Sequence, residues 1–273
     1  MKAVSATFIT GIILNISFAL AANPPATESW TLLESTKFGV FESLARCQGL
    51  TNDGQGHFWF SANQKLTRTT SNYTTEEKVN SSPLEEMKNL GANHIGDIDF
   101  SNGKIYAPVE DGRDYQHPII AVYNAQTLDL EKYSEISKEW LPDGIPWLAV
   151  DAKHSYLITS QYSHTTHINL YDLQTFKPVR QIPMSQMLTS IQGGKVFGDY
   201  LYMTANNETN TGFAVYKMDL MTGQISKIIS IDPSVVEIEG LTLNTQADGQ
   251  HMYVLGLTGS GLGKRIRLFH FKK

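Results

Sequence analysis

The clearest alternation of apolar and polar positions lies in the stretch from His94 to Glu110. Apolar residues recur in it with a period close to two, on both sides of Ser101-Asn102-Gly103. An Asn-Gly pair between two alternating runs is the strongest short-range signal for a β-hairpin. The stretch therefore predicts two antiparallel strands joined by a tight turn.

The same pattern recurs along the chain. Each copy reads as four short strands, and the matching positions in the first strands are spaced 48, 52, 44 and 47 residues apart: Leu50, Ile98, Val150, Gly194 and Leu241. Four antiparallel strands repeated about every 40–50 residues are typical of the blades of a β-propeller. The sequence therefore predicts an all-β fold of the β-propeller type.

The last repeat lacks a fourth strand, because residues 265–273 supply only its third. An isolated apolar stretch at residues 29–37 contains Trp30, Leu32 and Leu33 and belongs to no complete repeat. We expect it to pair with the strand near Ile266–Phe271, because this pairing would protect an exposed sheet edge. The prediction is five four-stranded blades, closed into a ring by the N-terminal strand, with six blades as the alternative.

Two similar turns follow the third strands of neighbouring repeats. They read Asn124-Ala125-Gln126-Thr127-Leu128 and Asp172-Leu173-Gln174-Thr175-Phe176, the latter preceded by Tyr171. The Tyr-Asp-x-Gln-Thr segment resembles secreted and periplasmic propellers of the quinoprotein-dehydrogenase-like and YVTN-repeat kind. The resemblance covers nearly all of the chain after residue 21. It implies the fold and says little about activity, since one fold hosts many functions.

The connections between repeats are longer than hairpin turns and carry short helical signals. These signals lie at residues 82–87, 137–140, 185–188 and 232–234. In a propeller such connections share a face with the loops that follow the second strands. We expect binding residues on this loop-rich face, because loops on a rigid scaffold commonly carry function.

The first residues predict an exported protein. Lys2 precedes an apolar run from Phe8 to Leu20, and Ala19-Leu20-Ala21 has the form of a cleavage site. We expect a signal peptide over residues 1–21 and a single β-propeller domain over residues 22–273. The apolar run is too short to span a bilayer. The protein is therefore expected to be secreted or periplasmic, without a membrane span, and monomeric.

Charge and cysteine content narrow the possible partners. The formal net charge is −5, which does not suggest a nucleic-acid partner. The single cysteine, Cys47, excludes an internal disulfide and falls at an apolar position of the repeat. There it is expected to be a small buried side chain rather than a nucleophile.

Polar side chains gather where the residues before the first strands meet the ends of the second strands. We call this end of the propeller axis the mouth. Three carboxylates fall there, from Asp97, Glu110 and Glu239. The residues that flank them are Gln48, Asn63, His94, Trp147, Gln161, Tyr162, Gln192 and Asn206.

Such an oxygen-rich mouth suits a calcium ion, since Ca²⁺ prefers carboxylate and carbonyl ligands. Asp97, Glu110 and Glu239 are the expected metal ligands, and the eight flanking residues are the expected ligand-binding set. Arg46 and Arg113 are the nearest positive charges that the repeat predicts. The alternative is that these polar groups bind channel water and cap the strand ends.

Two weaker resemblances concern activity. Glu239-Gly240-Leu241 resembles the opening of gluconolactonase-type propellers, which implies Glu239 as a metal ligand. Gln48-Gly49-Leu50-Thr51 looks like the opening blade of glutaminyl cyclotransferases. The sequence thus favours a propeller that binds a small-molecule or protein ligand, with a hydrolase or lyase using a central cation as the alternative. It assigns no catalytic residue.

Overall fold

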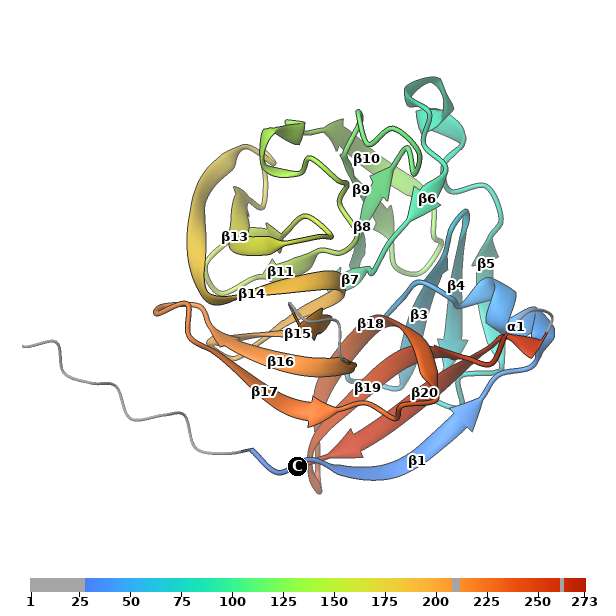
Figure 1. Cartoon of the computed structure of the whole chain (residues 1–273). Coiled ribbons are helices and arrows are strands. Elements are labelled where there is room, and N and C mark those ends of the chain that lie inside the picture. Colours follow the sequence, from blue (N-terminus) through green and yellow to red (C-terminus); the bar gives the residue numbers. More distant parts are fainter. Residues whose placement is uncertain (1–27, 208–211, 261–262) are drawn as a thin grey trace, which may run out of the picture.

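The computed structural model describes residues 28–207, 212–260 and 263–273. The predicted signal peptide at residues 1–21 lies outside the described residues. No helix in the described ranges is long and apolar enough to cross a membrane. The fold is all-β, and its sheets stand side by side around a common centre (Figure 1).

The first two sheets contain the first two sequence repeats. One sheet has the strand order β2-β3-β4-β5, with β2 (Gly49–Asn52), β3 (His57–Ala62), β4 (Lys65–Thr70) and β5 (Glu76–Asn80). The next contains β6 (His94–Ile95), β7 (Asp99–Ser101), β8 (Lys104–Glu110), β9 (Ile119–Asn124) and β10 (Leu130–Glu135). Here β6 and β7 both pair with β8, and the predicted hairpin is present, with Ser101 opposite Lys104.

The third and fourth repeats form one continuous sheet. Its strands are β11 (Ala149–Asp151), β12 (Tyr156–Thr159), β13 (Thr165–Asp172), β14 (Pro178–Phe197), β15 (Tyr200–Asn207), β16 (Phe213–Asp219) and β17 (Ile225–Ser230). The first half of β14 pairs with β13 and its second half with β15, so Leu188 lies opposite both Thr165 and Asn207. The helical signal predicted at residues 185–188 is therefore wrong. Main-chain and side-chain bonds from Ser185 to the Gly223–Ile225 turn hold this segment extended instead.

The last sheet joins the two ends of the described chain. It has the order β1-β20-β19-β18, with β1 (Thr31–Lys37), β18 (Val235–Gln246), β19 (Gly249–Thr258) and β20 (Arg265–Lys272). The pairing predicted for residues 29–37 is confirmed, because β1 runs antiparallel to β20 from Thr31 opposite Lys272 to Lys37 opposite Arg267. Trp30 packs against the core beside β1, whereas Leu32 and Leu33 are each 50% exposed. The strand is thus held mainly by its backbone pairing.

Short helices occupy three of the connections. The chain forms α1 (Val40–Ala45), which the sequence analysis missed, and the 3₁₀ helices η1 (Glu85–Leu90) and η2 (Lys138–Trp140). The hydroxyl of Ser137 caps η2 by accepting from the amide of Glu139 at 3.2 Å. The signal at residues 232–234 marks a turn rather than a helix, because the Asp232 side chain accepts from the amide of Ser234 at 2.8 Å.

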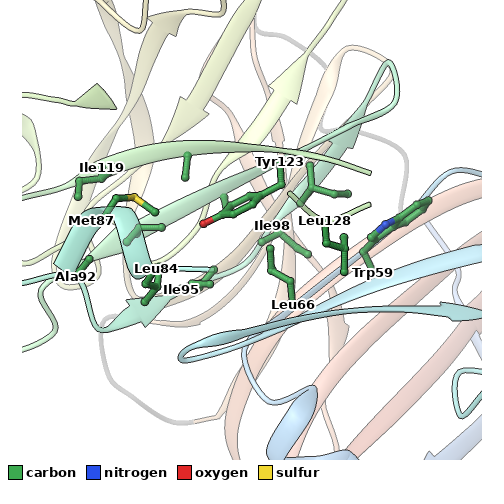
Figure 2. Packing of buried hydrophobic residues seen from close by; sticks show 14 of the residues in the cluster. Trp59, Leu66, Leu84, Met87, Ala92, Ile95, Ile98, Ile119, Tyr123 and Leu128 are labelled. Atoms are coloured by element: carbon green, nitrogen blue, oxygen red, sulfur yellow. The ribbon is translucent and has the colours of Figure 1, made fainter. Parts of the chain in front are cut away.

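Apolar side chains fill the space between neighbouring sheets. Figure 2 shows one such cluster, in which Trp59 and Leu66 from the first sheet lie near Ile98 and Tyr123 of the second. The polar atoms of its aromatic residues are satisfied: the indole N–H of Trp59 donates to the carbonyl of Ala125 at 2.7 Å. Each fully buried side chain of this kind stabilises the fold by about 1.5–3 kcal/mol. These clusters lock adjacent sheets together face to face.

The innermost segments meet at the centre of the molecule. Contacts run from β2 to β7, from β7 to β11, from β11 to β14, from β14 to β18, and from β18 to β2. Glycine is required in this crowded region, because a Cβ atom on Gly49 would lie 2.4 Å from the Cα atom of Asp97. The third repeat departs from the predicted register. Trp147, rather than Ala149, bridges to Asp97.

Candidate functional site

Asp97 lies at the centre and is fully buried. Its Oδ1 accepts from the amide of Leu50 at 2.9 Å, and its Oδ2 accepts from the amide of Gly194 at 3.2 Å. Burial raises the pKa of Asp97 to about 8, against the opposing effects of Lys195 and the two amides. Both carboxylate oxygens are therefore used to tie three repeats together.

A buried ion pair lies directly below Asp97. The Nζ of Lys195 donates to Asp99 Oδ1 at 2.9 Å and to the carbonyl of Ile98 at 2.8 Å. Asp99 also accepts from the hydroxyl of Thr51 at 3.1 Å and from the amide of Val150 at 2.8 Å. This network links four repeats, and it contains no group that is free to bind a ligand in the way the sequence predicted for Asp97.

The sequence analysis missed Lys195 as the central positive charge. The expectation for Arg46 and Arg113 is wrong: Arg46 pairs with Glu76 at 3.2 Å, and Arg113 is exposed. The sequence did contain a signal for the Lys195–Asp99 contact. Lys195 follows the matched residue Gly194, and Asp99 follows the matched residue Ile98. Opposite charges at equivalent repeat positions indicate contact across a propeller axis.

The first half of the mouth is a hydrogen-bonded group of three predicted residues. His94 places Nδ1 2.8 Å from Glu110 Oε1 and Nε2 2.8 Å from Gln48 Oε1. Glu110 Oε2 accepts from the amide of Ile145 at 2.8 Å. Gly144 has a φ of +102°, and a Cβ there would lie 2.2 Å from Glu110 Oε2, so the close approach depends on glycine.

The second half of the mouth centres on Glu239. Its side chain is buried, and burial together with the charges of Glu237 and Asp97 raises the pKa of Glu239 well above its ordinary value. Its Oε2 has no hydrogen-bond partner among the described residues. Gln192 donates from Nε2 to Glu237 Oε1 at 3.0 Å, so Glu237 is a further acidic residue that the sequence analysis overlooked.

Cys47 lies between the two halves. Burial and the nearby Glu239 carboxyl raise the pKa of the Cys47 thiol to about 11. A thiol with a raised pKa is a poor nucleophile at neutral pH. The two halves are joined through the backbone, because the amide of Gly240 donates to the carbonyl of Gln48 at 3.0 Å.

The remaining predicted site residues take different places. Trp147 is fully buried and donates from its indole nitrogen to the hydroxyl of Ser160 at 3.1 Å, so it supports the centre from within. Asn63 is exposed. Asn206 is buried and accepts from the amide of Gly212 at 3.2 Å.

Gln161 and Tyr162 belong to a loop organised by an aspartate that the sequence analysis did not select. Gln161 donates from Nε2 to the carbonyl of Ser163 at 2.6 Å. Asp143 accepts from the amide of Tyr162 at 2.9 Å and from the amide of Ser163 at 2.8 Å. Tyr115 lies beside this group. Burial raises the pKa of the Tyr115 hydroxyl, and the nearby Glu110, Asp143 and Tyr162 raise it further.

The predicted calcium ligands do not form one coordination group. Within the part of the chain that the structure describes, no group of three or more His, Cys, Asp or Glu side chains is arranged to hold a metal ion. Asp97 and Glu110 use both carboxylate oxygens for hydrogen bonds, whereas Glu239 Oε2 has none. Calcium binding stays a prediction, and Glu239 is the carboxylate best placed to take part in it.

Comparisons with known proteins show similarity of fold alone. No family model and no curated protein matches the chain. Among solved structures, an exo-1,5-α-L-arabinanase from a bovine ruminal metagenomic library matches with a TM-score of 0.53 and 12% identity, over 82% of this chain and 92% of that one. The tail fiber of Staphylococcus aureus phage P68 matches with a TM-score of 0.51 and 17% identity, over 90% of this chain and 53% of that one.

A third structural match, Saccharomyces cerevisiae Sqt1, has a TM-score of 0.41 and 15% identity, over 81% of this chain and 57% of that one. The chain thus spans little more than half the length of Sqt1 and of the phage tail fiber. Identities at this level show shared architecture and carry no information about a reaction. The chain has the fold of β-propeller proteins, and no sequence family is shown for it.

Proposed function

We propose that this chain is an exported five-bladed β-propeller that binds a small cation-bearing ligand at its mouth. The cyclic order of contacts among β2, β7, β11, β14 and β18 supports five blades rather than six. The pairing of β1 with β20 supports closure of the ring by the N-terminal strand. A closed ring would hold the mouth residues in fixed positions. Such a rigid arrangement favours a binding site that is already formed before the ligand arrives.

The proposal rests on one observation: Glu239 is buried, and its Oε2 has no hydrogen-bond partner among the described residues. A buried carboxylate oxygen without a hydrogen bond, such as Glu239 Oε2, is costly unless the group is protonated or meets a positive charge. The charge of Glu237, and that of Asp97 when it is ionised, raise the pKa of Glu239 further, so a positive charge beside Glu239 is favoured. A bound cation would relieve this repulsion and would replace the proton on Glu239.

Both an inorganic and an organic cation fit this description. Ca²⁺ would use Glu239, with oxygens from Gln48 or Gln192 and water completing its shell. An organic ammonium group would use the carboxylates of Glu239 and the neighbouring Glu237, which already accepts from Gln192. The proposal is that the positive charge sits at Glu239, and the identity of its carrier is an experimental question.

A thermal-shift screen tests this function directly. Calcium chloride, choline and putrescine would be added separately to the mature protein, and the melting temperature recorded against matched sodium chloride. We expect at least one of these compounds to raise the melting temperature, because a ligand that binds the native state stabilises it. Glu239→Gln should abolish the increase, while Glu131→Gln, at an exposed pair with Lys104, should retain it.

A hydrolase or lyase remains the second candidate because of one contact. The pairing of His94 Nδ1 with Glu110 resembles the way a carboxylate orients a catalytic imidazole. The other ring nitrogen is held by Gln48, so turnover would require this bond to open. Two assays test this candidate: hydrolysis of a panel of lactones, and cyclisation of peptides with N-terminal glutamine. Activity in either assay that is lost in His94→Gln would favour the enzyme.

A further inference from the structure

A cavity lies at the opposite end of the strands from the mouth. It has a volume of about 590 Å³ and is lined by the turns after β2, β4 and β18, together with residues of β3, β19 and β20. Gln48 precedes β2 at the mouth, whereas Asn52, the last residue of β2, lines this cavity. The cavity is therefore separate from the site of the proposed function. Its lining residues come from the first and the last sheets, which lie next to each other in Figure 1.

Aromatic rings form one wall of this cavity. Tyr73 and Tyr253 both contact Phe58 edge-to-face, with ring centroids 4.9 and 5.1 Å apart. His270 stacks on the other side of Tyr253, at 4.3 Å and an interplanar angle of 19°. Such rings offer flat apolar surfaces with a polar atom at the edge.

Amide side chains form another part of the lining, and they are already oriented. Asn52 donates from Nδ2 to the hydroxyl of Thr242 at 2.8 Å, and its Oδ1 accepts from Asn244 Nδ2 at 3.2 Å. Gln246 donates from Nε2 to the hydroxyl of Tyr253 at 3.0 Å, which links the amide wall to the aromatic wall. Asn52 is fully engaged within the protein, since it also bonds the carbonyl of Leu243 and the amide of Gly54, and it orients its neighbours. Gln246 is held in place by these contacts and could bond a ligand at little entropic cost.

The described residues that line the cavity carry no formal charge. They are glycine, alanine, serine, threonine, asparagine, glutamine, aromatic residues and His270. Burial lowers the pKa of His270, and the neighbouring His251 lowers it further, so the imidazole is neutral at neutral pH. This composition excludes the charge complementarity that an ionic ligand needs and suits a neutral one.

The backbone of Tyr73 fixes the position of its ring beside the cavity. Its φ is +63°, a conformation that non-glycine residues rarely adopt. The side chain of Asn72 holds this turn, because its Oδ1 accepts from the amides of Thr74 and Thr75 at 3.1 and 2.9 Å. Strained positions of this kind cluster at binding sites, where the surrounding structure fixes a side chain in place.

We infer that this cavity binds a neutral carbohydrate. Flat aromatic faces pack against the C–H groups of a sugar ring, and oriented amides bond its hydroxyls. The volume falls in the range of small-ligand sites, about 300–1,000 Å³. One or two pyranose or furanose units of a longer glycan would be accommodated, with Tyr73 as the stacking residue and Gln246 as a hydrogen-bonding residue.

The test is calorimetric titration with neutral oligosaccharides. Cellotetraose, maltotetraose, xylotetraose, arabinotetraose and chitotetraose would be titrated into protein from a host that does not glycosylate, because Asn72 begins an Asn-Tyr-Thr sequon beside the cavity. We expect saturable binding of at least one. Tyr73→Gly, which removes the ring and relieves the positive φ, should weaken it at least tenfold. Tyr73→Phe should retain it within about threefold.

Tyr133→Ala is the matched control, since Tyr133 is exposed on β10, outside the cavity. It should leave carbohydrate affinity unchanged. Melting curves of each variant establish that it is folded, and Gln246→Ala provides a second variant if Tyr73→Gly fails to fold. Absence of binding across the panel, or equal affinity of the folded Tyr73→Gly or Gln246→Ala protein, would overturn the inference.

Discussion

Lys195 and Asp99 form an ion pair of 2.9 Å at the centre of the molecule, with side-chain exposures of only 6% and 7%. The two residues come from different sheets, since Asp99 begins β7 and Lys195 lies in β14. Buried charges of this kind are tolerated only when each has partners in good geometry. The pair therefore fixes the position of β7 relative to β14. It thereby also fixes the position of Asp97 and of the mouth.

Lys195→Met should destabilise the protein strongly. Removing one partner leaves Asp99 as an uncompensated buried charge, which typically costs about 3–5 kcal/mol. Denaturant unfolding of the variant and the wild type measures the difference. Lys153→Met is the control, because the Lys153–Asp199 pair is exposed at 67% and 73%, and its loss should change little. Equal effects of the two substitutions would contradict the role given to Lys195.

The ionisation of Asp97 should weaken the fold as pH rises. Because its pKa increases from 3.8 to about 8 on folding, the native state holds a proton that the unfolded state has lost. Its contribution to the free energy of unfolding should therefore fall between about pH 4 and pH 8. Asp97→Asn should remove this slope, which urea unfolding across that range would detect. Parallel pH profiles for the two proteins would show that Asp97 does not titrate in this way.

The N-terminal strand should be needed for stability. Deleting residues 22–38 removes the partner of β20 and the buried Phe38, and it leaves a sheet edge open. Loss of the buried Phe38 ring alone should cost about 1.5–3 kcal/mol, and loss of the partly buried Trp30 adds to this. We expect a melting temperature lower by many degrees and a tendency to associate through the open edge. A monomer that melts at the wild-type temperature would argue against closure by β1.

Mild acid should loosen the same sheet. His251 Nδ1 lies 2.7 Å from His270 Nε2, with Asp248 on the far side of His251. Since burial and His251 lower the pKa of His270 below 6.5, the unfolded state takes up its proton first. Stability should therefore fall as pH decreases below about 6.5. His270→Gln should reduce this loss in a pH series of melting curves, and an unchanged loss would assign the acid sensitivity to other groups.

Export is tested by the mature N-terminus. Intact-mass spectrometry of protein recovered outside the cytoplasm should give a chain that begins near Ala22. A retained Met1 would be evidence against the predicted signal peptide at residues 1–21.

The repeat could be predicted from the sequence because apolar and polar residues alternate along each strand. Packing of one sheet against the next requires this alternation. The alignment of five first strands places Gln48, His94 and Glu110 at one end of the axis, where the structure has them hydrogen-bonded. The sequence did not predict that β14 pairs with both β13 and β15. A pattern assigned one repeat at a time cannot show a strand that is shared by two repeats. The partners of Asp97 were missed for a related reason, because backbone amides leave no signal in residue identities.

The most direct measurement of the central claim is calorimetric titration of cations at neutral pH in PIPES and in Tris, two buffers with different ionisation enthalpies that do not precipitate calcium. Because the pKa of Glu239 is raised, a cation that binds there should displace a proton, and the heat should depend on the buffer in the direction expected for proton release. We predict this signature for Ca²⁺, choline or putrescine, and its loss in Glu239→Gln. A flat trace for all three, or binding to Glu239→Gln with wild-type affinity and proton release, would contradict the account.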